Sequence, residues 1–393
     1  MDIASEIAVN ALALDPAFRE YELFHAYLGP AALKRRAKAI KPHDAALRLN
    51  EILQNGETEA LPDVFPFFRR TYAEAFLDCL CAQHDIFVKK RRLPFAIATH
   101  RISACELPGA FNLEKELAAL KKTLGTSGFK TIAQFRKNAP RIKFSSSSEL
   151  ADYALEKADA LSAFTQKRLG RHIPGLAALL KRSTLIIEPP KPGEPPCYYR
   201  YLGNYKGALG LSAKSDFARH YVHAFIMHEV MPGHHLYSLI RQHLADTQPQ
   251  DALFQLDTFY SPENIINEGL AVNGDLILGE FCPQETLLSS QIEKFLHKVL
   301  YNAWHGRNLG AGQIPKNCKK LLCGEAGFTA AETQEKLSFY AKQEKYYTPV
   351  YPAGTRLVSD FIQKHGLGAL AFVYGQPCHA ALKKISRELH GKQ

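Results

Sequence analysis

The sequence predicts a mainly α-helical protein with a small β-sheet next to one chemically distinctive helix. Residues 15–29 and 112–125 place apolar side chains three and four positions apart and end at glycine, as amphipathic helices do. Residues 145–170 open with a capping box, in which Ser146 caps the helix and Glu149 reaches back. Five prolines between residues 189 and 196 interrupt this helical pattern, because proline breaks helices.

The small sheet is expected within residues 184–213. Tyrosine-rich and glycine-rich stretches follow the prolines there, and they predict one or two short strands with a turn at Gly203 and Asn204. Helices then resume, one capped by Ser215 and carrying His228, and another capped by Ser261 with Pro262 at its first position. Residues 283–393 are again expected to be mainly helical.

Length and composition favour a globular protein without a membrane span. The chain has 393 residues, of which 46% are hydrophobic, and lacks any apolar run of about 18 residues. We expect an N-terminal helical portion (1–140) and a catalytic portion (141–393) that form one continuous domain, since no clear linker separates them. Acidic residues near the N-terminus replace the basic ones of an export signal, which predicts a cytoplasmic protein.

Charge and cysteine content narrow the range of partners. The formal net charge is +10, but the basic residues are spread out and no nucleic-acid-binding motif accompanies them, so nucleic acid is not the expected partner. The eight cysteines match no zinc-ribbon or redox spacing, and we expect them to be reduced, mostly buried thiols. The sequence indicates neither the oligomeric state nor a specific substrate.

The segment "HEVMPGHH" (228–235) is the chemically distinctive one. His228 shares a helix face with Tyr221, Ala224 and Phe225, so it lies on the apolar side. Glu229 follows directly, and a buried carboxylate is costly without a positive partner. A divalent metal ion would supply that partner.

A regular helix could not bring these histidines to one metal ion. Positions i and i+6 lie about 9 Å apart along a helix and about 120° apart around it. Pro232 cannot bond the carbonyl of His228, and Gly233 can adopt positive φ, so we expect the helix to loosen after Glu229. Looping out two residues would bring His234 to the metal and looping out three would bring His235; we favour His234.

A third ligand is expected on the next helix. Glu268 lies on an apolar stripe with Ile265, Ala271 and Val272, and Asp275 lies two turns further on the same side, where it could orient a histidine. His228, His234 and Glu268 would hold Zn²⁺ and leave a fourth position for water. Zinc lowers the pKa of bound water to about 7, and Glu229 would accept its proton during attack on a carbonyl.

An oxyanion that develops during such a reaction needs a hydrogen-bond donor beside the metal. The segment "KYYTPVYPAG" (345–354) offers three tyrosines, of which we select Tyr351 as the catalytic one.

These motifs resemble those of the bacterial domain-of-unknown-function family 885, which is marked by H-E-x-x-P-G-H-H and a following leucine. "HEVMPGHHL" (228–236) fits every fixed position, and "NEGLAVNGD" (267–275) is similar to the family's E-G-W-A helix, with Leu270 in place of tryptophan. "VYPAG" (350–354) is similar to its S-Y-x-I-G stretch and places Tyr351 at the tyrosine. The order of segments also fits from about residue 145 to 280.

The resemblance implies a mostly helical zincin-type metallopeptidase fold, with His228, His234 and Glu268 as ligands and Glu229 as general base. The chain departs from the family in "KYYT" (345–348), and "FLHKVLYNAWHGRNLGAG" (295–312) has no clear counterparts of the family's arginine, aspartate and histidine residues. A second relative, the Q-E-G-L-A family of tyrosine-type carboxypeptidases, shares "EGLA" (268–271) but has a shorter histidine spacing.

The expected function is zinc-dependent hydrolysis of peptide or amide bonds. Two alternatives are hydrolysis of an amide in a non-peptide small molecule, and a catalytically silent metal-binding scaffold. The strand segment 198–212 could hold an extended peptide by edge pairing. Arg356 or Arg307 could meet a substrate carboxylate.

Overall fold

The computed structural model describes most of the chain. The described residues are 2–18, 23–64, 67–191, 197–212, 217–248, 252–258, 260–310, 312–340, 346–375 and 378–390. The proline-rich residues 192–196 and the expected helix cap Ser215 lie outside these ranges.

The protein is mainly helical, and short strands are inserted between the helices. The N-terminal part contains α1 (Ile3–Leu14), β1 (Phe24–Tyr27), α2 (Ala31–Ala37), α3 (Pro42–Gln54), β2 (Asp63–Val64), β3 (Phe67–Phe68), α4 (Arg69–Gln83), α5 (Phe95–Ser103), α6 (Leu113–Thr126) and α7 (Ile132–Asn138). The central part contains β4 (Arg141–Ile142), α8 (Ser147–Leu169), α9 (Leu176–Arg182), β5 (Thr184–Glu188), β6 (Cys197–Gly203), β7 (Lys206–Leu211), β8 (Phe217–Ala218), α10 (Arg219–Glu229), α11 (His234–Thr247), β9 (Leu256–Thr258), α12 (Asn264–Val272) and α13 (Gly274–Leu278). The C-terminal part contains α14 (Gln284–Asn308), α15 (Lys316–Lys320), α16 (Ala330–Tyr340), α17 (Val350–His365), α18 (Leu370–Gly375) and α19 (His379–His390).

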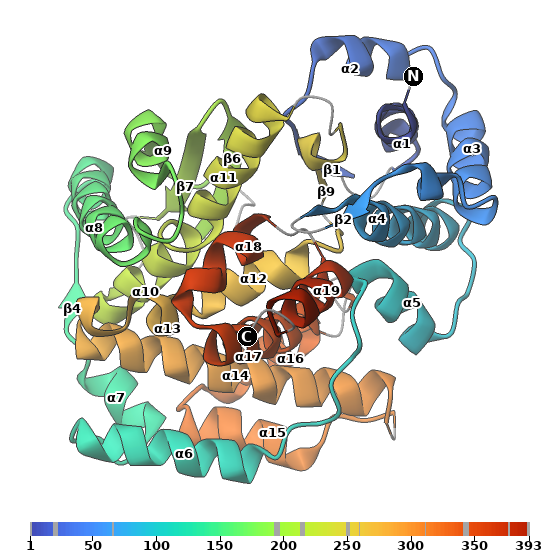
Figure 1. The fold of residues 1–393 in the computed structure, drawn as a ribbon. Helices are drawn as coiled ribbons and strands as arrows, with labels where there is room; N and C mark the ends of the chain where they lie inside the picture. Colours follow the sequence, from blue (N-terminus) through green and yellow to red (C-terminus); the bar gives the residue numbers. More distant parts are fainter. Residues whose placement is uncertain are drawn as a thin grey trace.

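The helices are arranged around α12, which lies in the middle of the molecule (Figure 1). The N-terminal helices α1–α4 gather on one side of it, and α8, α9 and the strands β6 and β7 lie on the other. The long helix α14 runs beneath the centre, with α6 and α15 on its outer side. No helix among the residues placed by the structure is long and apolar enough to cross a membrane.

The expected small sheet forms, and it has three strands. Strand β7 is central, with β5 parallel to it on one side and β6 antiparallel on the other. The β6–β7 turn falls at the predicted position, and Asn204 and Tyr205 take positive φ there. Three further antiparallel pairs, β1–β9, β2–β3 and β4–β8, have two strands each.

Two helix predictions need correction. Residues 15–29, expected to form a helix, contain one short 3-10 turn (Asp15–Ala17) and then β1, which pairs with β9. The apolar spacing there suits a helix, but backbone pairing with a distant strand prevails. The helix expected from Ser261 begins at Asn264, and Ser261 instead accepts a hydrogen bond from the N–H of Glu263.

The capping box of α8 is confirmed at its first half. The Ser146 hydroxyl accepts a hydrogen bond from the N–H of Glu149 at 3.1 Å. The carboxylate of Glu149 reaches back one residue further than expected, to the N–H and hydroxyl of Ser145. All eight cysteines are free, and most are buried, as expected.

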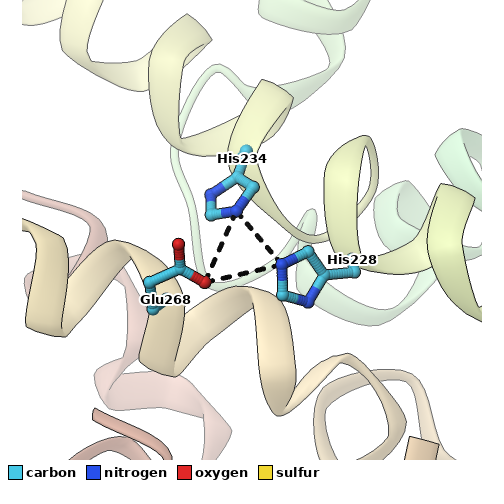
Figure 2. Close-up of side chains that lie close together, drawn as sticks. All are labelled: His228, His234 and Glu268. Atoms are coloured by element: carbon cyan, nitrogen blue, oxygen red, sulfur yellow. Dashed lines mark hydrogen bonds and ion pairs between the residues drawn. The ribbon is translucent and has the colours of Figure 1, made fainter. Parts of the chain in front are cut away.

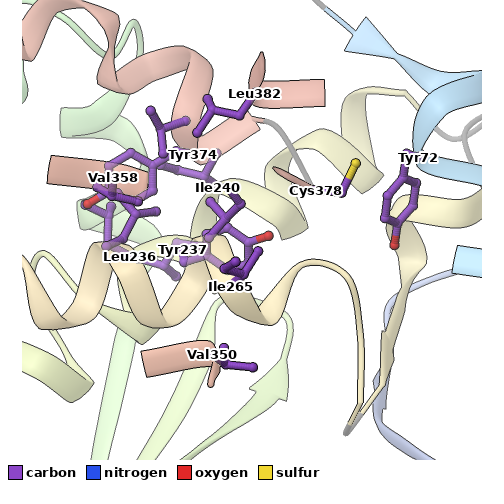
Figure 3. Packing of buried hydrophobic residues seen from close by; sticks show 14 of the residues in the cluster. Tyr72, Leu236, Tyr237, Ile240, Ile265, Val350, Val358, Tyr374, Cys378 and Leu382 are labelled. Atoms are coloured by element: carbon purple, nitrogen blue, oxygen red, sulfur yellow. The ribbon is translucent and has the colours of Figure 1, made fainter. Parts of the chain in front are cut away.

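The main hydrophobic core connects helices α11, α12, α17 and α18. Leu236, Tyr237 and Ile240 of α11 lie beside Ile265 of α12 (Figure 3). Val350 and Val358 of α17 and Tyr374 of α18 belong to the same core, as do apolar residues of α1 and α4. This core therefore includes residues from both sides of position 140. A second core lies between α14 and the helices α6, α7, α15 and α16.

Helices α12 and α17 cross at two glycines. A Cβ atom on Gly269 would lie 2.4 Å from the carbonyl oxygen of Gly354, and one on Gly354 would lie 2.2 Å from that of Ile265. Only glycine allows the two backbones to approach this closely. The crossing brings the first turn of α17 next to Glu268.

The start of α12 is held by a buried ion pair. Glu263, which precedes the helix, pairs with Arg241 of α11, and both side chains are almost completely buried. The hydroxyls of Tyr72 and Tyr237 also donate hydrogen bonds to Glu263. A buried carboxylate with several partners fixes the position of α12 relative to α11 and α4.

Candidate metal centre

The chain turns sharply between α10 and α11. Helix α10 ends at Glu229 and α11 begins at His234, so the expected loosened helix is a complete break. The peptide bond between Met231 and Pro232 is cis, and the hydroxyl of Tyr374 donates a hydrogen bond to the carbonyl of Pro232 at 2.6 Å. The break redirects the chain so that the first residue of α11 faces the last turn of α10.

Gly233 is needed in this turn for a reason that differs from the expected one. Its φ is −79°, so it does not use the left-handed region. A Cβ atom at this position would instead lie 1.6 Å from the carbonyl oxygen of His228. Close approach of two backbone segments therefore requires glycine here.

His228, His234 and Glu268 converge at one point (Figure 2). The two Nε2 atoms lie 3.2 Å apart, and Oε2 of Glu268 lies 3.5 Å from that of His228 and 3.7 Å from that of His234. Ligand atoms about 2.0–2.2 Å from a tetrahedral zinc ion are separated by about 3.3–3.6 Å. The three donors therefore have the spacing of three corners of a metal tetrahedron, and the group could hold a metal ion.

One carboxylate oxygen of Glu268 accepts a hydrogen bond, and the other accepts none from the described residues. Oε1 accepts a hydrogen bond from the hydroxyl of Tyr347 at 2.7 Å. Oε2 is buried, has no hydrogen-bond partner among the residues described, and faces the two imidazoles. An orphaned buried carboxylate oxygen is costly, and a cation at the centre of the cluster would satisfy it.

The ionisable side chains of the cluster shift one another's pKa values. Burial opposes ionisation of Glu268, but the charge of His234 and the contact with His228 outweigh it and lower its pKa to about 2. Burial likewise disfavours a charged His228, but Glu268, Glu229 and Glu293 raise its pKa to about 9. The site therefore attracts positive charge, whether it comes from protons or from a metal ion.

Asn267, the residue before Glu268, orients the second histidine. Its Oδ1 lies 2.8 Å from Nδ1 of His234. Because an amide oxygen only accepts hydrogen bonds, Nδ1 carries the proton and Nε2 keeps its lone pair for the centre. Asp275, the residue expected in this role, pairs instead with Lys294 at 2.5 Å.

His235 points away from the cluster. Its Nε2 lies 2.7 Å from the hydroxyl of Ser183, and its Nδ1 lies 2.9 Å from that of Tyr199 on β6. Burial lowers its pKa to about 4. Of the two histidines that the sequence left open, the structure brings His234 to His228 and Glu268.

Glu229 and Tyr351 both lie beside the cluster. Oε2 of Glu229 is 3.9 Å from Nε2 of His234, and burial raises the pKa of this carboxyl. The ring of Tyr351 packs against Tyr347, with centroids 5.5 Å apart. Burial and the charges of Glu268 and Glu229 raise the pKa of Tyr351 well above its ordinary value, so its hydroxyl stays protonated.

Helix α14 adds two residues that sequence reasoning missed. The ring of His297 packs on Tyr351, with centroids 4.6 Å apart, and its Nδ1 is buried without a partner in the described structure. Glu293 lies one turn earlier. In the sequence, only the four-residue spacing of Glu293 and His297 on one helix could have indicated them. This signal is weak because many helices carry such a pair.

The two arginines proposed for a substrate carboxylate are placed elsewhere. Arg356 is exposed and faces Asp360 at 3.5 Å, and Arg307 is exposed near the end of α14. Neither lines the cavity that lies between α7, α10, α14 and α16.

Comparison with known proteins does not assign a family or a function to this chain. No protein-family model matches the chain, and no curated protein matches it. One solved structure, described as "a putative lipoprotein of unknown function" from Shewanella oneidensis, is similar with a TM-score of 0.47 and 15% sequence identity, over 92% of this chain and 67% of that one. A likeness of this degree transfers no function, so the site must be interpreted from its own geometry.

Proposed function

We propose that this protein is a zinc-dependent hydrolase of peptide or amide bonds, with His228, His234 and Glu268 as the metal ligands. The observation that carries the proposal is the spacing of their three donor atoms, 3.2, 3.5 and 3.7 Å, next to the buried carboxylate of Glu229. Two imidazoles and one carboxylate are a ligand set used by catalytic zinc. The resemblance of the H-E-x-x-P-G-H-H segment to zincin-type metallopeptidases supports the same assignment.

The residues around the centre divide the chemistry between them. When bound, zinc would lower the pKa of water to about 7 and polarise a carbonyl group. Glu229 would accept the proton of the attacking water and return it to the leaving amine. Burial favours this role because it raises the pKa of Glu229 and makes the carboxylate a better proton acceptor.

Tyr351 is proposed to stabilise the developing oxyanion. The hydroxyl of Tyr347 is engaged with Glu268, whereas the hydroxyl of Tyr351 has no hydrogen-bond partner in the described part of the chain. A protonated, uncommitted phenol can donate a hydrogen bond to negative charge that appears during the reaction. We therefore assign Tyr347 to ligand orientation and Tyr351 to catalysis.

The sheet next to the site favours a peptide substrate. Strand β6 is an edge of the three-stranded sheet. Its Tyr199 lies with its ring centroid 6.4 Å from that of His234. An extended peptide could pair with such an edge while its scissile bond reaches the metal centre.

Metal analysis and a peptide-library cleavage assay, each with and without chelator, test the proposal. The purified protein should bind about one zinc ion and lose cleavage on chelation. Glu229→Gln should keep the metal but lose turnover by about 100-fold or more, whereas Glu285→Gln, an exposed acid on α14, should change neither. Tyr351→Phe should lower kcat by about 100-fold, as loss of an oxyanion donor does.

The outcomes separate the alternatives. Undiminished turnover in a metal-loaded Glu229→Gln variant would exclude the mechanism. Zinc binding without cleavage of any peptide or small-molecule amide would indicate a silent metal-binding scaffold. Cleavage restricted to non-peptide amides would keep the chemistry but change the substrate class.

A further inference from the structure

A cavity of about 420 Å³ lies next to the metal cluster, between α7, α10, α14 and α16. This volume is in the range of small-ligand sites in proteins. Tyr221, Glu293 and His297 line the part of the cavity closest to the cluster. His297 contacts Tyr351, and the charge of Glu293 acts on both His228 and Glu229, so this end adjoins the catalytic residues.

Three basic side chains also line the cavity. Arg136 of α7, Arg141 of β4 and Lys336 of α16 all line it. Arg136 and Lys336 lie over the ring of Phe328, at 4.0 and 4.9 Å from its centroid. Arg136 and Arg141 belong to one basic stretch of the chain, and the fold brings Lys336 of the distant helix α16 to them.

Two of these positive charges lack a paired carboxylate. Within the described ranges, neither Arg136 nor Lys336 forms an ion pair, and Arg136 donates a hydrogen bond only to the carbonyl of Ala326. The carboxylate of Glu332 lies nearby but accepts a hydrogen bond from the N–H of Thr329. Burial lowers the pKa of both Lys336 and Arg136, and repulsion between the cations lowers them further. The charge of Glu332 raises both pKa values, and Glu335 and Glu293 also raise that of Lys336, but they do not outweigh burial. Positive charge held in this way favours an anion.

We propose that the cavity binds a carboxylate of the substrate at Arg136, Arg141 and Lys336, so that the enzyme prefers amides that carry an acidic group. Arginine and lysine form charge-assisted hydrogen bonds with carboxylates, and Tyr221 and Phe328 add aromatic surface to the lining of the cavity. This inference rests on the proposed function for its catalytic meaning. The acidic group is either the α-carboxylate of a C-terminal residue or an acidic side chain, which share the same chemistry.

Calorimetry on the zinc-loaded protein tests the anion site without any turnover. Three probes distinguish the two sources: N-acetyl-L-phenylalanine, its C-terminal amide, and the α-amide of N-acetyl-L-glutamic acid. We expect at least one carboxylate probe to bind about 10–100-fold more tightly than the neutral amide. Lys336→Gln and Arg141→Gln should each remove most of this difference, while Lys319→Gln and Arg307→Gln, which change exposed residues, should leave it intact.

The variants also separate the anion site from direct binding to the metal, because metal coordination is unchanged in all four. Equal binding of carboxylate and amide probes, or unaltered preference in both Lys336→Gln and Arg141→Gln, would overturn the inference. The Arg141 side chain is exposed, so its variant remains informative if Lys336→Gln unfolds. If peptides are cleaved, the same variants should raise KM for acidic substrates about 10–100-fold with little change in kcat. Selective binding without cleavage would support the cavity and contradict the proposed function.

Discussion

Asn267 accepts a hydrogen bond from Nδ1 of His234 at 2.8 Å, and it does so from the position directly before Glu268 on α12. One short helix therefore supplies both a candidate ligand and the group that orients another ligand. Any shift of α12 would alter both contacts at once. This relationship makes Asn267 the most informative residue for testing the centre away from its ligands.

Asn267→Ala should weaken zinc binding about 10–100-fold, the usual cost of losing a partner behind a metal-bound histidine. Without the amide oxygen, the imidazole of His234 is free to rotate and to carry its proton on Nε2, where it cannot bind metal. Competition with a chromophoric chelator measures the affinity. Asn267→Asp should retain most of it, because a carboxylate also accepts the Nδ1 hydrogen bond.

Asn308→Ala serves as the matched control, since among the described residues the only hydrogen-bond partner of the Asn308 side chain is the carbonyl of Trp304 near the end of α14. If Asn267→Ala and Asn308→Ala bind zinc equally well, the hydrogen bond to His234 does not position a ligand.

The sequence predicted the three residues of the His228, His234 and Glu268 cluster because each has a local signal. His228 and Glu268 lie on apolar helical faces where a charged or polar side chain needs a partner, and Pro232 and Gly233 mark a break that redirects His234. Asn267 and His297 lack such signals. Their importance comes from contacts between α12, α11 and α17, and between α14 and α17, which depend on tertiary packing that no local pattern encodes.

The secondary structure, too, was predicted where a local signal exists and missed where distant contacts decide it. The capped helix α8 and the β6–β7 turn follow local rules and were predicted closely. Strand β1 was missed because its apolar spacing also suits a helix, and only its pairing with β9, more than 200 residues away, decides the outcome. The cluster of Arg136, Arg141 and Lys336 was missed for a similar reason, because Lys336 lies almost 200 residues after the other two in the sequence.

The acid stability of the protein should depend on His220. This side chain is 5% exposed, and burial together with Arg141, His223 and Arg136 lowers its pKa to about 4. The unfolded chain has the ordinary histidine pKa of about 6.5 and therefore binds more protons than the folded state between pH 6.5 and 4. The free energy of unfolding should fall as the pH drops through this range, with a contribution from His220 of up to about 3 kcal/mol.

Urea unfolding at pH 8, 6.5, 5 and 4.5 measures this contribution. His220→Gln can keep the contact with Ser289 but cannot titrate, so its stability should fall less steeply than that of the wild type below pH 6.5. The difference at pH 8 gives the pH-independent cost of the substitution. Parallel pH curves for the two proteins would show that His220 is not buried as a neutral group.

Gly354→Ala should destabilise the protein and disturb the metal centre together. The new Cβ atom would lie 2.2 Å from the carbonyl oxygen of Ile265, so α12 and α17 must separate. Overpacking of this kind costs about 1–3 kcal/mol, which should appear as a lower melting temperature. Because Glu268 is on α12 and Tyr351 is on α17, the same movement should weaken zinc binding and lower kcat.

Gly125→Ala is the control for this substitution. Its Cβ atom would meet nothing within 4 Å, and in the helix α6 the alanine should stabilise the protein by about 0.5–1 kcal/mol. A Gly354→Ala protein with normal stability and zinc affinity would mean that the two helices do not need to cross this closely.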